Sequence, residues 1–242
     1  MIFEILNDTQ TDLAIRITLL IALPIIVLMS LSIHEYAHGL VSYALGDPTA
    51  KNRGRLTLNP LKHINPIGLL CMLLFRFGWA NPVPVDPRYY RNPKRGMAIC
   101  GLAGPFINLV IGVKAYAVHC AAVWFAMHPA ALNRIPFISY VSDTAYIIFA
   151  QIFGIIGCYN ILIAVFNLIP VPPLDGSRLM YAFLPDRYYF RVMKYERVIM
   201  FVMLALLWVG MLDFFIDGAF TLVASGIENA VYGLLDALYN FT

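Results

Sequence analysis

The pentapeptide His34-Glu35-Tyr36-Ala37-His38 has the form H-E-x-x-H. Residues four apart on a helix project from nearly the same face, so His34 and His38 can bind one metal ion through imidazole nitrogens. Zinc suits this pair, because it accepts nitrogen and oxygen ligands and keeps one position open for water in catalytic sites. Glu35 can take a proton from that water and return it to a leaving amine. The motif predicts metal-assisted hydrolysis.

The alternative for the motif is a pair of ordinary histidines on a polar helix face. Apolar residues flank the motif on both sides, namely Leu31, Ile33, Leu40 and Val41. Uncompensated histidine and glutamate side chains at membrane depth would be costly. We therefore favour metal binding.

A zinc site of this kind needs a third protein ligand. Asp175 is our candidate, because it follows a later apolar run in a proline-rich turn. The alternative is that Asp175 caps a short helix at 177–184, and these residues alone leave both possibilities open. His63 lies in a basic loop, and His119 and His128 are expected at the opposite membrane face, so we prefer the carboxylate.

The composition is that of a membrane protein. The chain has 242 residues, of which 60% are hydrophobic and 13% charged, whereas soluble domains are nearer half apolar and a quarter charged. The net charge is +3 and no basic run indicates a nucleic-acid partner. The four cysteines show no C-x-x-C spacing, so we expect buried thiols and no cysteine-bound zinc.

Four apolar stretches are long enough to cross a bilayer, which takes about 20 residues of helix. We expect these spans at 13–45, 97–127, 146–169 and 192–216, the last around the apolar run 198–212. The tail at 218–241 predicts an amphipathic helix that lies on the membrane, with a fifth span as the alternative. The expected fold is an all-α polytopic membrane protein with four to five transmembrane helices.

The connection at about 50–90 predicts a re-entrant or short extended, β-like segment. Its apolar stretch, 67–77, is too short to span. Val83-Pro84-Val85 should be extended, because proline disfavours helix in the preceding residue. In the second span, Lys114 either snorkels toward the interface or pairs with an acid such as Asp143.

Basic residues concentrate in two segments, 46–95 and 177–197, which the expected spans place on one side. By the positive-inside rule that side is cytoplasmic. The N-terminus is then outside, and the metal site lies toward the cytoplasm. The connections are too short for a soluble domain. We therefore expect one membrane-embedded domain over 1–242, with a catalytic core at about 13–184 and a C-terminal span and amphipathic tail at 185–242.

Two distant motifs together resemble the site-2 protease family of intramembrane zinc metalloproteases. One is H-E-x-x-H in a membrane span, and the other is Asn167-x-x-Pro170-x-Pro172-Pro173-Leu174-Asp175-Gly176 after a later span. Further stretches at 46–50, 54–60, 81–85 and 103–108 resemble a compact prokaryotic branch of this family, without a PDZ or CBS domain.

The resemblance implies one Zn²⁺ per chain, bound by His34, His38 and Asp175, with Glu35 activating water. It implies that Asn108 and Asn167 lie near the cleft, where they position substrate or stabilise an oxyanion. An interhelical hydrogen bond is the alternative for each asparagine.

The resemblance also implies a prokaryotic inner membrane and single-span transmembrane proteins as substrates. Their helices must unwind locally, since a helix hides its peptide bonds in its own hydrogen bonds. The oligomeric state stays open.

Two other functions compete with a zinc metalloendopeptidase. A non-proteolytic zinc-binding membrane scaffold of the same fold would have an altered Glu35, which is present. A zinc or ion transporter would have paired broken helices in two related halves, and no internal repeat is visible. We therefore predict hydrolysis of peptide bonds within or near the bilayer.

Overall fold

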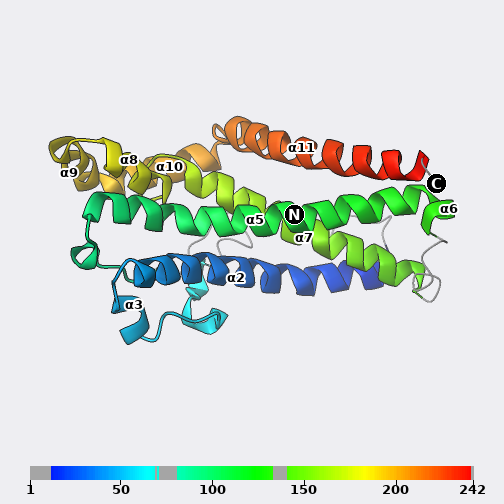
Figure 1. Cartoon of the computed structure of the whole chain (residues 1–242), viewed down its shortest axis with the longest axis horizontal. Coiled ribbons are helices and arrows are strands. Elements are labelled where there is room, and N and C mark those ends of the chain that lie inside the picture. The colour runs from blue at the N-terminus through cyan, green and yellow to red at the C-terminus, as the bar shows by residue number, and fades with distance from the viewer. Residues whose placement is uncertain (1–11, 69, 71–80, 133–140, 241–242) are drawn as a thin grey trace.

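The computed structural model describes residues 12–68, 70, 81–132 and 141–240. Four long helices lie lengthwise in a bundle: α2 (Leu13–Ala44), α5 (Pro93–Met127), α7 (Asp143–Leu168) and α11 (Asp213–Asn240) (Figure 1). Each is long and apolar enough to cross a membrane. Helix α5 is central, because it packs against the other three. The structure confirms an all-α polytopic membrane protein.

The shorter helices lie in the connections. Between α2 and α5 are α3 (Thr49–Asn52), η1 (Pro60–Lys62) and η2 (Pro87–Tyr89); α6 (Pro129–Leu132) follows α5; and α8 (Gly176–Phe183), α9 (Asp186–Lys194) and α10 (Glu196–Trp208) precede α11. Helices α8 and α9 lie at one end of the bundle, and α6 and the C-terminal end of α11 lie at the other (Figure 1). The two ends of the bundle therefore carry different connections.

The long helices begin at polar caps. The Asp12 carboxylate accepts a hydrogen bond from Ala14 N at the start of α2, and Ser142 Oγ accepts one from Ala145 N at the start of α7. Asn92 caps α5 in the same way, with Pro93 at the first helical position. These caps satisfy backbone N–H groups that the helices themselves leave unpaired.

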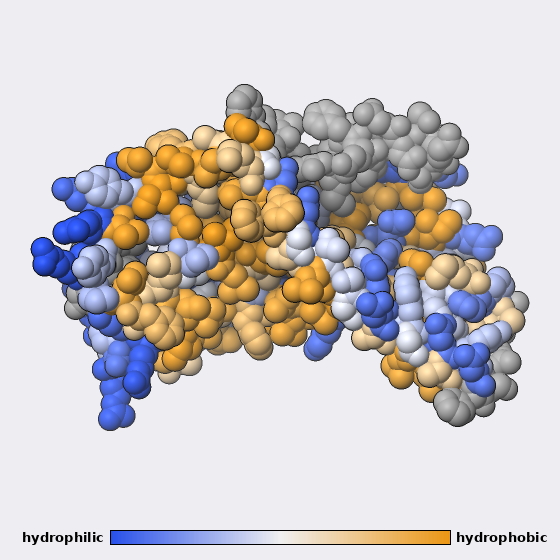
Figure 2. Space-filling view, turned by 90° about the horizontal axis from the view of Figure 1, so that it is seen from above, coloured by the Kyte–Doolittle hydropathy of each residue, from blue (hydrophilic) through white to orange (hydrophobic). Residues whose placement is uncertain are grey.

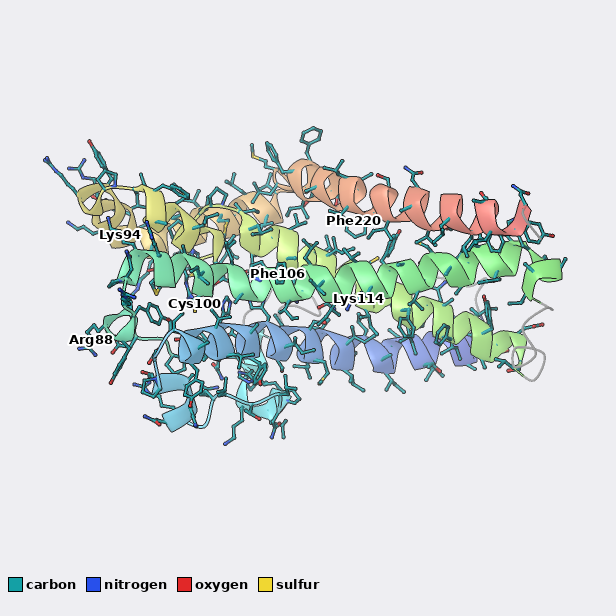
Figure 3. All side chains as sticks on the ribbon, viewed as in Figure 1. Arg88, Lys94, Cys100, Phe106, Lys114 and Phe220 are labelled. Atoms are coloured by element: carbon teal, nitrogen blue, oxygen red, sulfur yellow. The ribbon has the colours of Figure 1, made fainter. Side chains whose placement is uncertain are left out.

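The surface of the bundle is apolar along its middle. Figure 2 shows a hydrophobic band over the centre of one face, with hydrophilic residues gathered toward the ends. Exposed apolar side chains recur along α2, among them Ile17, Ile21 and Ile25. Lys114 lies near the middle of α5 and is exposed (Figure 3). Among the described residues no ion pair joins it to Asp143, so the exposure of Lys114 favours snorkelling.

The C-terminal region differs from the expectation. Helix α10 has only 13 residues, about 20 Å at the usual rise per residue, against a hydrocarbon core of about 30 Å. Gly210, with φ +78°, lies just beyond its end, and α11 follows. The structure therefore does not support a span built on 198–212. The C-terminal helix long enough to cross is α11, which covers the tail expected on the membrane surface.

The connection between α2 and α5 is only partly described. The short apolar stretch at 67–77 falls mostly outside the described residues, so its re-entrant character stays a prediction. Among the described residues of this connection there is no strand. Residues 81–86 are non-helical, as expected around Val83-Pro84-Val85.

Two hydrogen bonds dock α11 on α5. Tyr116 Oη donates to Glu228 Oε1, and Trp124 Nε1 donates to Asp236 Oδ1, both at 2.6 Å. The paired residues are spaced equally along each helix, so the bonds set one parallel register. Next to Glu228, Ile227 packs with buried residues of α5 and α7.

We predict that Tyr116→Phe loosens α11, because the change removes the hydrogen-bond donor and leaves the Glu228 carboxylate without it. Interhelical hydrogen bonds in membrane proteins contribute about 0.6 kcal/mol on average. The unfolding temperature in detergent should therefore fall by roughly 1–2 °C. Glu228→Gln is the matched control, since its amide oxygen can still accept the bond. Equal losses in the two variants would contradict this account.

Candidate metal centre

His34 and His38 lie one helical turn apart on the last part of α2. Their ring centroids are 4.7 Å apart and the rings are nearly perpendicular, at 82°. Each residue is only 4% exposed, although it lies in a helix whose other faces meet the surroundings. The two Nε2 atoms approach to 3.1 Å, so the helical spacing brings two nitrogen ligands to one point.

Asp175 reaches the same point from the connection after α7. A Cβ on Gly176 would lie 2.4 Å from the carbonyl oxygen of Leu168, so glycine lets the connection pass directly against the end of α7. Asp175 Oδ2 lies 2.9 Å from His34 Nε2 and 3.0 Å from His38 Nε2. The Asp175 side chain makes no capping bond to α8. Asp175 is thus the N-cap residue of α8 by position, but its side chain is directed to the histidines.

The three side chains fit a zinc ion. In the described part of the chain they form a buried group with one ligand atom each, and these atoms all lie within 4.8 Å of one another. A tetrahedral zinc with bonds of about 2.0–2.1 Å separates its ligands by roughly 3.3 Å, close to the 2.9–3.1 Å found here. A single metal ion at this point would be within reach of all three ligand atoms.

Helix α5 forms the wall behind the ligands. His38 Nδ1 donates to the Cys100 carbonyl oxygen at 2.7 Å, which leaves Nε2 as a lone pair directed at the metal position. Cys100 lies on the part of α5 next to the end of α2 (Figure 3). A Cβ on Gly104 would lie 2.5 Å from His38 Nε2 and 2.6 Å from His34 Nε2. Glycine at this position therefore makes room for the ligand pair.

Arg178 lies beside the other oxygen of Asp175. Its Nη1 is 3.8 Å from Asp175 Oδ1, and its side chain passes α5 where Gly101 has no Cβ to obstruct it. In the chain without a metal ion, burial raises the pKa of the Asp175 carboxyl, but hydrogen bonds and charge from the two imidazoles outweigh burial and hold that pKa below its usual value. The carboxylate is therefore available as an ionised ligand.

Glu35 is held from the connection between α2 and α5. Val83 N donates to Glu35 Oε2 at 2.7 Å. The side chain of Val83 is buried against Gly39, where an added Cβ would lie 3.2 Å from Val83 Cγ1. One carboxylate oxygen of Glu35 is thus occupied by the backbone, and the other oxygen makes no hydrogen bond within the described residues.

The two asparagines named from the sequence have different surroundings. Asn108 is fully buried, and its Nδ2 lies 3.1 Å from Asn160 Oδ1 and 3.4 Å from the Ser30 carbonyl oxygen. Asn160 also donates to Ser30 Oγ at 2.9 Å. These bonds join α2, α5 and α7 one turn from His34, which favours the interhelical role for Asn108. Asn167 is half-buried and donates to Ile163 O of its own helix.

The other histidines lie elsewhere. His63 is buried, with Nε2 near the Thr57 carbonyl oxygen. His119 contacts Ala150 O from the distal part of α5, and His128 stacks on Trp124 at the end of that helix. None belongs to the ligand group. Sequence reasoning missed the contributions of Cys100, Gly104, Ser30, Asn160 and Val83. Of these, only Gly104 and Val83 lie within stretches that resemble the family, at 103–108 and 81–85.

The sequence is similar to a described protein family and to several named proteins. The model of peptidase family M50 matches residues 22–210. A Bacillus subtilis (strain 168) protein named "Putative zinc metalloprotease YwhC" is 36% identical over 163 residues, 67% of this chain and 69% of that protein. "Putative zinc metalloprotease Rip2" of Mycolicibacterium smegmatis is 31% identical over 153 residues, 62% of this chain and 52% of that protein. No solved structure matches the chain.

We predict that Gly104→Ala expels the metal, because the new methyl group would overlap both imidazoles. Zinc affinity should fall at least as far as the roughly 10-fold that loss of a ligand's supporting hydrogen bond costs. The measurement is metal content after dialysis against graded chelator. Gly226→Ala on α11 is the matched control, since nothing lies within 4 Å of its added Cβ. Unchanged zinc binding by the Gly104 variant would contradict this prediction and show that the site tolerates a methyl group at position 104.

Proposed function

The chain belongs to peptidase family M50, the site-2 protease family, and from this premise we propose that it is an intramembrane zinc metalloprotease. The observation that carries the proposal is the convergence of His34, His38 and Asp175 beside α5, with Glu35 on the same turn of α2. The relatives named as zinc metalloproteases support the same reaction class. We propose one zinc ion per chain.

The mechanism divides among the residues of the site. His34, His38 and Asp175 would hold the ion, which when bound supplies a polarised water of lowered pKa. The oxygen of Glu35 that makes no hydrogen bond within the described residues would accept a proton from the attacking water and return it to the leaving amine. The amide of Asn167 is our candidate donor to the developing oxyanion. Asn108 remains a second candidate, although its bonds to Ser30 and Asn160 favour a role in holding the helices together.

We propose that the site faces the cytoplasmic side of a prokaryotic inner membrane, with the N-terminus outside. The end of the bundle that holds the site also holds Arg88 and Lys94 (Figure 3). Lys94 Nζ donates to Leu184 O, which links α5 to the basic α8–α9 region. Cationic residues at one end support this orientation by the positive-inside rule. Water would reach the site from that end.

The proposed substrates are single-span transmembrane proteins. Their scissile bonds must leave the helix before they can be cut, because a helix engages every peptide group within the bilayer. Asn81–Asp86 is non-helical backbone beside Glu35, so an unwound substrate segment could pair with it by strand addition. Pairing with this segment would place one peptide bond of the substrate next to Glu35.

Glu35→Gln separates this proposal from zinc transport and from a scaffold. The variant should keep its zinc, since the ligands are untouched, while cleavage should fall by roughly 10²–10⁴-fold with loss of the base. The measurements are bound zinc per chain and cleavage of a panel of single-span substrates in detergent. Cleavage equal to that of the wild type, or a wild type that binds no zinc, would reject the proposal. Zinc flux into proteoliposomes tests the transporter alternative.

Local unwinding predicts a dependence on the substrate's own helix stability. Glycine in a helix interior costs about 1 kcal/mol relative to alanine, which is roughly a 5-fold change in the unwound population. A substrate with Ala→Gly beside the cleaved bond should therefore be cut up to about 5-fold faster. The same exchange at the opposite end of the span is the control. Equal rates for both substrates would mean that unwinding does not limit cleavage.

A further inference from the structure

Asp47 is a fully buried carboxylate that takes no part in the metal group. It follows α2 in a turn where Gly46 adopts φ +102°. Three donors satisfy it: Ser42 Oγ at 2.8 Å, Asp86 N at 2.7 Å and Thr49 N at 2.9 Å. Burial raises the pKa of the Asp47 carboxyl, but these hydrogen bonds outweigh burial and lower it. A buried, ionised and fully bonded carboxylate indicates a specific role.

The bond to Asp86 N connects Asp47 to the segment that holds Glu35. That segment, Asn81–Asp86, is anchored at its other end through Asn81, whose N donates to His63 O at 2.8 Å and whose Nδ2 donates to Ile64 O at 2.6 Å. Val83 N, between the two anchors, donates to Glu35 Oε2. Pro82 and Pro84 restrict the backbone on both sides of Val83. Displacement of Asp86 would therefore displace Val83.

A second layer of contacts keeps Asp47 itself in place. Ser42 Oγ gives its proton to Asp47, so the hydroxyl of Tyr90 is the donor in the 2.7 Å contact with Ser42 Oγ. Tyr90 is buried against Gly96, where an added Cβ would lie 2.4 Å from Cδ2 of the ring. The end of α2, the segment 81–86 and the start of α5 are thus tied together through one carboxylate.

We propose that Asp47 is a positioning residue for the catalytic base. It fixes residues 81–86 so that Val83 N–H holds one oxygen of Glu35 and leaves the other oxygen available to accept a proton. The inference rests on the proposed function, because Glu35 acts as a base only in hydrolysis. A carboxylate held at one oxygen cannot rotate freely, so the held geometry serves the chemical step.

The test uses the full-length, zinc-loaded protein with a single-span substrate. Asp47→Asn places an amide where a carboxylate accepted backbone N–H groups, so kcat should fall roughly 10–100-fold, the range expected for one charge-assisted hydrogen bond. Bound zinc should be unchanged, since the zinc ligands are untouched. Asp12→Asn, at the opposite end of α2, is the matched control. A normal kcat for Asp47→Asn overturns the proposal.

A double-mutant cycle distinguishes positioning from general stability. Val83→Pro removes the N–H that holds Glu35. If Asp47 acts through that N–H, adding Asp47→Asn to Val83→Pro lowers kcat no further. A multiplicative loss in the double variant overturns the proposal. Ser42→Ala removes one donor to Asp47 and retains the others, so it should lower kcat by a smaller factor. This variant replaces Asp47→Asn in the test if Asp47→Asn does not fold.

Hydrogen exchange gives a readout that needs no activity. The amide hydrogens of Asn81–Asp86 belong to Asn81, Val83, Val85 and Asp86, since prolines carry none. Exchange of this segment should speed up in both Asp47→Asn and Glu35→Ala, and unchanged exchange overturns the inference. Faster exchange in both variants, combined with no cleavage by the wild-type protein, would instead reject the proposed function. If Asp47→Asn cleaves substrate as fast as the wild type does, only the role of Asp47 is rejected.

Discussion

The close approach of α5 to α2 at Gly104 is the contact on which the metal centre depends. Only a hydrogen atom in place of a side chain lets the α5 backbone lie against two imidazoles, and the same turn supplies the Cys100 carbonyl that orients one of them. Helices in a membrane gain little from apolar burial, so small residues that allow tight packing set their contacts. Gly104 on α5 therefore allows both the close packing of α5 against α2 and the compact arrangement of the ligands.

The rest of the site comes from irregular backbone at one end of the bundle. Asp175 arrives from the connection after α7, where Gly176 contacts the helix end, and Val83 arrives from the connection after α2. Such backbone is stable near a membrane only when protein or water satisfies its polar groups. The bonds at Asp47 and Asn81 provide this for the second connection. The long helix α2 thus provides the two histidines, and the hydrogen-bonded connections provide Asp175 and Val83.

The C-terminal region shows the limit of hydropathy. Residues 198–212 are more uniformly apolar than the tail, yet α10 is too short to cross. The tail contains the acids Glu228 and Asp236, and it predicted a surface helix because Asn229, Asp236 and Asn240 lie off its apolar face. In the structure these acids accept bonds from Tyr116 and Trp124, so α11 lies along the bundle. A hydrogen-bond donor on another helix lowers the free-energy cost of placing an acidic side chain in a membrane helix. A hydropathy profile does not include such interhelical bonds.

By itself, the sequence determined the helical class, the first three spans to within a few residues and the two-histidine pair, because each depends on local length, hydropathy or a four-residue spacing. Asp175 required the joint resemblance of two distant motifs, since the residues alone left a helix cap open. Only the tertiary structure decided that Asp175 meets the histidines, that Gly104 faces them and that Val83 holds Glu35. These contacts depend on the rotation and depth of one helix against another, which neither spacing nor hydropathy specifies.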